Sequence, residues 1–345
     1  MKVCVVGAGS IGERHARVFS KLRGVEGVCV VEPRAERVEE LRRRYPQFEF
    51  RSGLEDATPG RYQVCSVCVP APLHMPVATA ALERDMHTLI EKPLTTSLPD
   101  VAPVARLAEA RRLTVGVAHV YRFIPELVRL REEVQAGAIG EVKHVRFISG
   151  QHFPTIRPDY NKIYFARRAM GGGVLLDFAC HSVDYFQWLC GRAIEVAAVA
   201  DRMMLDEIET EDLAEVLLKF DNGARGAIHV NAFQRDYLLD IHIAGTKGTL
   251  RARLAAETRK VHTEGQFAWT LERCGEDGKF VEISSTAYER DHFYSLQAQN
   301  FLNAVAGREP VCATLADGAA AVAVCLAAYR SAMERRSVLV PKNQI

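Results

Sequence analysis

The 345-residue sequence predicts a two-domain α/β protein: an N-terminal doubly wound parallel sheet, then a C-terminal α/β domain with a largely antiparallel open sheet. Three observations lead to this prediction. The chain is longer than one typical hydrophobic core requires. Up to about residue 120, apolar strands alternate with helical stretches, as in a parallel sheet. Beyond that point short strands interleave polar and apolar residues, which favours antiparallel pairing. We expect domains at 1–120 and 121–345.

The first element is an apolar strand at residues 2–6, followed by Gly7, Gly9 and Gly12 and then by a helical pattern. At this spacing the first glycine permits a tight turn and the second lets a pyrophosphate approach the backbone. The third lets the helix pack against the strand. The phosphates then meet the helix N-terminus, here Ser10 and Ile11. The motif predicts a Rossmann dinucleotide-binding domain.

The second strand, residues 28–32, ends at Glu32 and is followed by Arg34. A carboxylate at this point accepts hydrogen bonds from the ribose hydroxyls and repels a 2′-phosphate, which favours NAD. An arginine just past the strand can pair with that phosphate instead, so NADP stays open as an alternative.

The alternation continues through helices at 35–45, 75–85 and 98–112 and strands at 63–70, 87–94 and 113–120. Ligands of such a sheet lie beyond the carboxyl ends of its strands. Two loops at such ends add residues to the expected cofactor site: Val69, Pro70, His74, Glu91 and Lys92. A lysine partly withdrawn from water has a lowered pKa and can exchange a proton with a substrate hydroxyl. The alternative for Lys92 is a solvated loop lysine.

The second domain is expected to begin with a helix over 121–140, ended by glycine. The alternating segments that follow predict strands at 141–151, 195–205, 211–220, 225–233, 238–246, 248–254 and 260–265. The sequences DNGARG and GTKGT predict turns between them. An Ala-rich stretch at 315–335 predicts a C-terminal helix.

The segment GGGVLLDFACHSVDYFQWL (171–189) carries three titratable groups on one face of a helix. Asp177 and His181 are i, i+4, and Asp184 follows one turn later. His181 suits the base that removes a hydroxyl proton near neutral pH, and Asp177 would fix the substrate or the imidazole tautomer. Asp184 is expected to be structural. A buried network of mutually satisfied groups is the alternative; the predicted mechanism requires no metal.

The segment before this helix, residues 152–170, predicts a long loop rich in Arg, Tyr and Lys. It supplies the expected substrate-binding residues Arg157, Tyr160, Tyr164 and Arg167. Arginine and tyrosine together suit a polar or anionic sugar derivative. A solvated charged loop is the alternative.

Composition argues against several classes of partner. The net charge of +1 provides no electrostatic footprint for nucleic acid or an anionic membrane. We find neither a signal-peptide pattern nor an apolar run of 18 residues. The nine cysteines are odd in number and lie mostly in apolar runs, which predicts reduced thiols and a cytoplasmic location. Cys65 and Cys68 have C-x-x-C spacing, but in a strand they point to opposite faces, so no metal is expected.

Taken together, GAGSIGERHA, VPAPLH, IEKPL, YRFIPELVRL, GGGVLLDFACHSVDYF and AGTKGTL resemble the Gfo/Idh/MocA family of oxidoreductases in order and spacing. The resemblance implies a catalytic set of Lys92, Asp177 and His181, and we add Arg122 of the YRF segment to the substrate site. It also implies a homodimer or homotetramer formed through the C-terminal sheet. Ala71 and Ala179 depart from the common pattern, and neither removes a catalytic side chain.

The predicted function is an NAD(P)-dependent dehydrogenase that transfers hydride between nicotinamide and a hydroxyl carbon. The expected substrate is a sugar, sugar acid, cyclitol or sugar nucleotide, with no nucleic-acid or membrane partner. Two alternatives remain: an NAD-dependent redox-assisted glycosidase, and a non-catalytic NAD-binding sensor.

Overall fold

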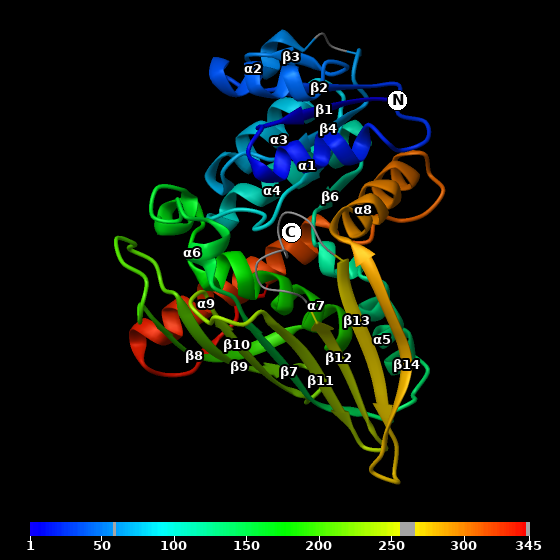
Figure 1. Ribbon diagram of the computed structural model, residues 1–345, viewed down its shortest axis with the longest axis vertical. Helices are drawn as coiled ribbons and strands as arrows, with labels where there is room; N and C mark the ends of the chain where they lie inside the picture. Colours follow the sequence, from blue (N-terminus) through cyan, green and yellow to red (C-terminus); the bar gives the residue numbers. More distant parts are fainter. Residues whose placement is uncertain (58–59, 256–265, 343–345) are drawn as a thin grey trace. The chain divides into compact units, whose positions relative to one another are not determined.

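The computed structural model describes residues 1–57, 60–255 and 266–342, which form two compact units (Figure 1). The first unit contains Met1–Val120 and Phe293–Ala319, and the second contains Tyr121–His292 and residues 320–342. Residues 293–319 thus lie with the first unit, whereas the sequence analysis assigned them to the second domain.

The first unit is built on a six-stranded sheet in which every pair of neighbours is parallel. Its strand order is β3-β2-β1-β4-β5-β6. The strands are β1 (Lys2–Val6), β2 (Gly27–Val31), β3 (Glu49–Arg51), β4 (Val64–Val67), β5 (His87–Ile90) and β6 (Val115–Val117). The order reverses between β1 and β4, and ligands of such sheets bind beyond the carboxyl ends of the strands at this point.

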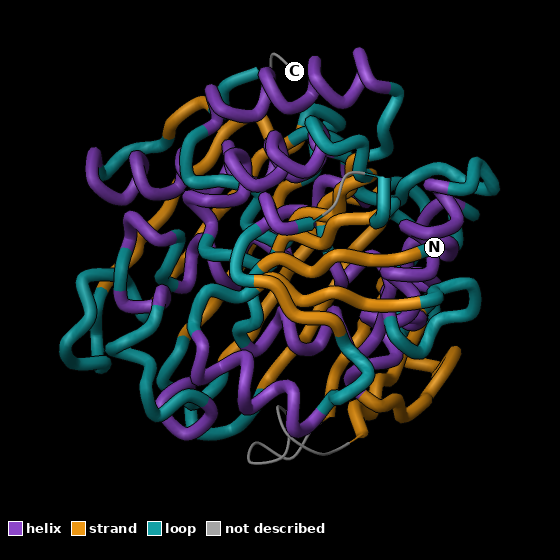
Figure 2. The backbone as a smooth tube through the Cα atoms, turned by 90° about the horizontal axis from the view of Figure 1, so that it is seen from above, coloured by secondary structure: helices purple, strands orange, loops and turns teal. Residues whose placement is uncertain are grey.

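Five helices accompany the first sheet; in Figure 2 helices are purple and strands orange. They are α1 (Ser10–Phe19), α2 (Ala35–Arg44), α3 (His74–Leu82), α4 (Val101–Arg111) and α8 (Arg290–Val305). Phe301 and Leu302 of α8 are buried in one core cluster with Val5 of β1 and Phe19 of α1. This apolar packing explains why α8, although late in the chain, belongs to the first unit.

The second unit contains a nine-stranded sheet in the order β14-β13-β12-β11-β7-β10-β9-β8-β15. The pair β7–β10 is parallel and the other pairs are antiparallel. The strands are β7 (Val142–Gly150), β8 (Ala193–Asp201), β9 (Leu213–Phe220), β10 (Arg225–Asn231), β11 (Leu238–Gly245), β12 (Thr249–Ala255), β13 (Gln266–Cys274), β14 (Phe280–Glu289) and β15 (Val338–Leu339). The predicted fold class is confirmed.

One face of this sheet is apolar and buried, and the other is open. Phe147 and Ile241 are buried, whereas the alternate positions carry Arg146, Val199 and Leu217, which are exposed. The helices described in this unit are α5 (Pro125–Gln135), α6 (Phe153–Ile156), α7 (Cys180–Cys190) and, from Ala320 onward, α9 (Leu315–Glu334). Helix α9 is long and apolar enough to cross a membrane, but 67% of its most apolar window is buried inside the protein, as in a core helix.

The strands of the second unit differ from the sequence prediction at several points. Strands β13 and β14, the long yellow and orange arrows at one sheet edge in Figure 1, were not predicted. Residues 202–205, predicted to extend a strand, form a loop because the Asp212 carboxylate accepts the N–H groups of Met203, Met204 and Leu205. The strand predicted at 260–265 lies outside the described residues.

Candidate functional site

The glycine-rich turn has the geometry that a pyrophosphate requires. Gly7 has a φ of +93°, and a Cβ at Gly12 would collide with the carbonyl oxygen of Gly7. Gly9, by contrast, faces open space: a Cβ there would meet nothing within 4 Å. Ser10 and Ile11 open α1 directly after it. The residues therefore fit the phosphates of a dinucleotide, with the backbone accessible where the approach must be closest.

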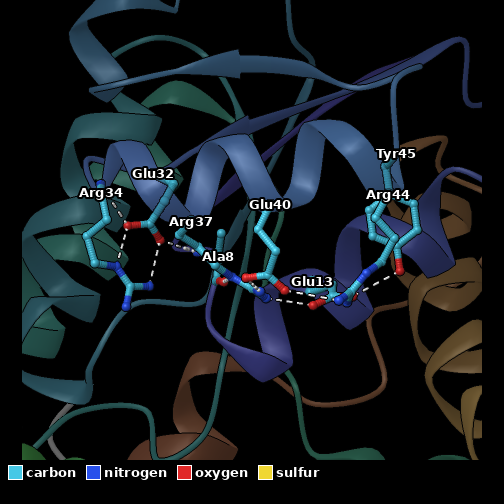
Figure 3. A network of polar contacts seen from close by, with 8 residues as sticks. All are labelled: Ala8, Glu13, Glu32, Arg34, Arg37, Glu40, Arg44 and Tyr45. Carbon is cyan, nitrogen blue, oxygen red and sulfur yellow. Dashed lines mark hydrogen bonds and ion pairs between the residues drawn. The ribbon is translucent and has the colours of Figure 1, made fainter.

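Glu32 is held at the end of β2 by four hydrogen bonds (Figure 3). It accepts from the N–H of Ala8 at 3.0 Å, from the N–H of Arg34 at 3.1 Å and from the Arg34 guanidinium at 2.7 and 3.1 Å. Burial alone would raise the pKa of Glu32, but these donors lower it below its usual value. The carboxylate stays ionised and suits ribose hydroxyls, while the exposed Arg34 remains the group that could meet a 2′-phosphate.

A second arginine, Arg37 of α2, supports the same turn and was missed by the sequence analysis. Its Nε donates to the carbonyl oxygen of Ala8 at 2.9 Å, and its other nitrogens pair with Glu13 and Glu40 (Figure 3). The peptide groups at Ala8 are therefore fixed through both N–H and C=O. The turn is preorganised by a network of side chains from α1, α2 and the end of β2.

The loops after β4 and β5 are tied together by His74. Its ring nitrogens lie 2.8 Å from the carbonyl oxygen of Val69 and 3.0 Å from that of Pro93. The side chain is 1% exposed, and burial lowers its pKa. His74 thus braces Val69 and the neighbouring exposed Pro70 against the loop that carries half-buried Lys92.

Glu91 connects this loop to α1. Its Oε2 accepts the N–H of Lys92 at 3.0 Å, and its Oε1 lies 2.9 Å from Nε2 of His15. Glu91 is 6% exposed, and both of its carboxylate oxygens face groups of the protein itself. The signal that could have found His15 is its place three residues after Gly12.

In the second unit, Asp177 lies in a π-helical turn, Leu175–Ala179, that runs directly into α7. Such wide turns are rare in proteins, and those that occur are often found at functional sites. The turn begins where Gly172 packs against the carbonyl oxygens of Tyr164 and Phe165, too close for any Cβ. The Leu175 N–H donates to the buried carboxylate of Glu211 at 2.9 Å. Glu211, which the sequence analysis did not select, anchors the start of the segment.

Asp177 and His181 each contact a tyrosine. The hydroxyl of Tyr164 donates to Oδ2 of Asp177 at 3.0 Å; Asp177 is 6% exposed and Tyr164 39%. The ring of Tyr121 stacks on the half-buried His181 imidazole, with centroids 4.6 Å apart and planes at 12°. Tyr121 is a further residue that the sequence analysis missed, because nothing local relates it to His181.

Asp184 and Arg122 form a buried bidentate ion pair. Nε and Nη2 of Arg122 donate to the two carboxylate oxygens at 2.9 and 2.7 Å, and the guanidinium lies over the Trp188 ring at 5.3 Å. Arg122 is 4% exposed. This geometry makes it a brace for α7. Among the described residues no cluster of His, Cys, Asp and Glu could hold a metal ion.

The other residues expected to bind substrate lie in the segment between β7 and the π-helical turn. Instead of one irregular loop, this segment contains α6 and short 3-10 turns at Tyr164–Ala166 and Arg168–Met170. Arg157 pairs with Asp159 at 3.3 Å, Tyr160 is half-buried and Arg167 is exposed. Phe153 and Phe165 pack with Phe178 beneath the segment. Of the four, Tyr164 reaches Asp177.

Two protein-family models match this chain, one in each unit. Residues 1–119 match the family model described as "Oxidoreductase family, NAD-binding Rossmann fold", and residues 127–251 match the GFO/IDH/MocA C-terminal domain. The chain is 25% identical to myo-inositol 2-dehydrogenase of Thermotoga maritima, covering 98% of each chain. It is 26% identical to UDP-N-acetylglucosamine 3-dehydrogenase of Acidithiobacillus ferrooxidans, covering 96% of each.

A solved structure is similar over the same length. It is GenD2 from gentamicin A biosynthesis, in complex with NAD, which is 25% identical with a TM-score of 0.82 and covers 99% of this chain and 97% of its own. The prediction of an NAD-binding oxidoreductase is confirmed. The chain belongs to the Gfo/Idh/MocA family of oxidoreductases, and its first unit is the family's NAD-binding Rossmann domain.

Proposed function

We propose that this protein is a dehydrogenase that oxidises or reduces a hydroxyl carbon of a sugar, sugar acid, cyclitol or sugar nucleotide, with NAD preferred over NADP. The observation that carries the proposal is the placement of Asp177 and His181 four residues apart, where the π-helical turn continues into α7. A tyrosine contacts each of them. The names of the relatives, which act on myo-inositol and on UDP-N-acetylglucosamine, support the substrate class.

The bound cofactor supplies the hydride acceptor or donor. The protein's task is then to handle one proton and to orient one hydroxyl. We assign the proton to His181, because histidine is the side chain most often used as a general base near neutral pH. Asp177 accepts a hydrogen bond from a neighbouring substrate hydroxyl and thereby fixes its orientation, and Tyr164 fixes Asp177 in turn. Lys92 donates a hydrogen bond to the reacting oxygen.

For the substrate contacts beyond this set we propose Tyr160, Arg157 and Arg167. All three come from the segment that precedes the π-helical turn. Their charge and hydrogen-bonding capacity suit a carboxylate or phosphate on the sugar. If Arg157→Ala and Arg167→Ala leave KM for the identified substrate unchanged, this segment does not set specificity.

We also propose a cytoplasmic homodimer or homotetramer formed through the open face of the nine-stranded sheet. Val199 on β8 and Leu217 on β9 are 55% and 61% exposed on that face, which indicates an apolar patch suited to a contact between subunits. The nine cysteines are free thiols, as in proteins of reducing compartments. Light scattering should give a dimer or tetramer for the wild type and a smaller species for Leu217→Glu; a monomeric wild type would rule the assembly out.

The experiment that tests the function is a panel of polyols, sugar acids and nucleotide sugars, followed at 340 nm with NAD and NADP in parallel. A dehydrogenase gives NADH in proportion to product. Cleavage of a glycoside without net NADH identifies the redox-assisted glycosidase instead, and NAD binding without turnover of any compound identifies a sensor.

A further inference from the structure

His15 occupies a place in the first unit that the proposed reaction does not yet explain. It lies on α1, one turn after the glycine-rich motif, and is 3% exposed. The edges of two aromatic rings enclose it, Phe19 with centroids 6.3 Å away and Tyr294 of α8 at 6.1 Å. A buried imidazole needs protein partners for its ring nitrogens.

Nδ1 has a hydrogen-bond partner, and Nε2 has an ion-pair partner. Nδ1 lies 2.8 Å from Oγ of Ser66, and Nε2 lies 2.9 Å from Oε1 of Glu91. Ser66 is fully buried and Glu91 nearly so. Since a lone carboxylate is strongly disfavoured in such surroundings, Glu91 can remain ionised there only with a cationic partner.

The charge state of the pair follows from all the groups that face it. Burial lowers the pKa of His15, but Cys68 and Glu91 raise it, and the net effect places it well above its usual value. Burial likewise opposes ionisation of Glu91, yet His15 and Lys92 lower its pKa. From α8, Tyr294 adds an aromatic contact, and the Arg14 guanidinium lies over the same ring, 4.9 Å from its centroid. Both shifts favour the ionic form of the pair, in which an imidazolium faces a carboxylate.

Glu91 also contacts the main chain of the next residue. Its second oxygen, Oε2, accepts the main-chain N–H of Lys92 at 3.0 Å. The helix that begins at the pyrophosphate turn is thus joined through two side-chain contacts to the backbone from which the Lys92 side chain projects. We propose that His15 is a positioning residue: its imidazolium orients Glu91, and Glu91 fixes the main chain at Lys92. This inference rests on the proposed role of Lys92 in the reaction.

The first test needs no substrate. Lysine side chains are labelled with trace acetic anhydride and the rate at Lys92 is measured by mass spectrometry relative to exposed Lys279, in wild type, His15→Gln and Glu91→Gln. We expect His15→Gln to raise the relative rate at Lys92 several-fold, because the loop is released. Glu91→Gln retains an oxygen that can accept the Lys92 N–H and should raise it less. An unchanged rate in His15→Gln overturns the proposal.

The second test is a double-mutant cycle in kcat with the polyol that gives NADH in the panel. We expect His15→Gln to lower kcat by about 10- to 100-fold, the usual cost of misplacing a reacting group by about 1 Å. In a Lys92→Met background the same change should have no further effect. Effects that multiply in the double variant overturn the proposal, because His15 would then act independently of Lys92.

Two controls keep the outcomes distinct. If Lys92→Met is fully active, the proposed role of Lys92 fails, while the labelling result still reports on the positioning contact. If His15→Gln does not fold by circular dichroism, a Glu91→Leu variant, which removes the acceptor for the Lys92 N–H, takes its place in both tests with the same expected direction.

Discussion

The imidazole of His181 lies flat against the ring of Tyr121, with centroids 4.6 Å apart and planes inclined by only 12°. The contact fixes the plane of the proposed base, and it places an aromatic face where positive charge develops when His181 takes a proton. Aromatic faces stabilise such cations by about 0.5–1 kcal/mol at partly exposed sites.

Tyr121→Leu is therefore expected to lower kcat about two- to fivefold, the equivalent of that cation–π energy. Tyr121→Phe keeps the ring and should stay near the wild-type rate, which makes it the matched control. Steady-state kinetics at saturating NAD measure both. Equal losses in the two variants would show that the hydroxyl, and not the stacked ring, matters.

The Arg122–Asp184 pair gives a prediction about stability. Arg122→Met removes the bidentate cationic partner of Asp184, which is 1% exposed. Breaking such a pair from one side costs about 3–5 kcal/mol. We expect a matching fall in the free energy of unfolding measured with urea, and recovery of most of it in Arg122→Met/Asp184→Leu. If the double variant is no more stable than the single one, the ion pair is not what stabilises α7.

Glu32 gives a prediction about the cofactor. Glu32→Ser removes the carboxylate that repels a 2′-phosphate and releases Arg34 from its bidentate contact. The dissociation constant for NAD should rise about tenfold and that for NADP should fall, consistent with loss of hydrogen bonds to a charged group worth about 1.5–3 kcal/mol. Titration calorimetry with both dinucleotides measures the change. An unaltered NAD/NADP ratio would remove Glu32 as the discriminating residue.

Glu211 is expected to make the free energy of unfolding depend on pH. Burial raises its pKa above the usual 4.5, against the opposing effect of hydrogen bonds from Leu175 and Tyr329. Between pH 4.5 and the raised pKa, Glu211 binds more protons in the folded protein than in the unfolded chain. Its stabilising contribution is therefore fully present below pH 4.5 and is lost as the pH rises through the pKa of the folded state. Glu211→Gln keeps the acceptor oxygen and removes the titration. Its urea unfolding free energy should decline less with rising pH above 4.5 than that of wild type; parallel curves would contradict the assignment.

The sequence was sufficient for the first sheet because each strand and crossover helix there is specified by local pattern and by glycine chemistry. Strand β3 has three residues, too few for a periodic signal. Strand β14 is mostly exposed and shows no regular alternation, so pairing with β13 defines it. Helix α8 packs on strands nearly 300 residues earlier in the chain, which no local pattern predicts.

The candidate site likewise contains residues that local motifs predict and residues that only the fold brings together. Lys92, Asp177 and His181 lie in short motifs whose spacing indicates chemistry. The ion pair of Arg122 could not be predicted, since its partner Asp184 is 62 residues away and only the fold brings the two charges together. Tyr121 and Glu211 were missed for the same reason: their roles come from contacts across the unit.

The central claim is that His181 removes the substrate proton in an NAD-dependent oxidation, and NADH formation by His181→Asn tests it most directly. The initial rate of NADH formation, followed at 340 nm with the substrate found in the panel, should be at least about 100-fold lower than in the wild type. This is the lower range for removing a general base. Calorimetry should give the wild-type dissociation constant for NAD. A variant that forms NADH at the wild-type rate would contradict the account.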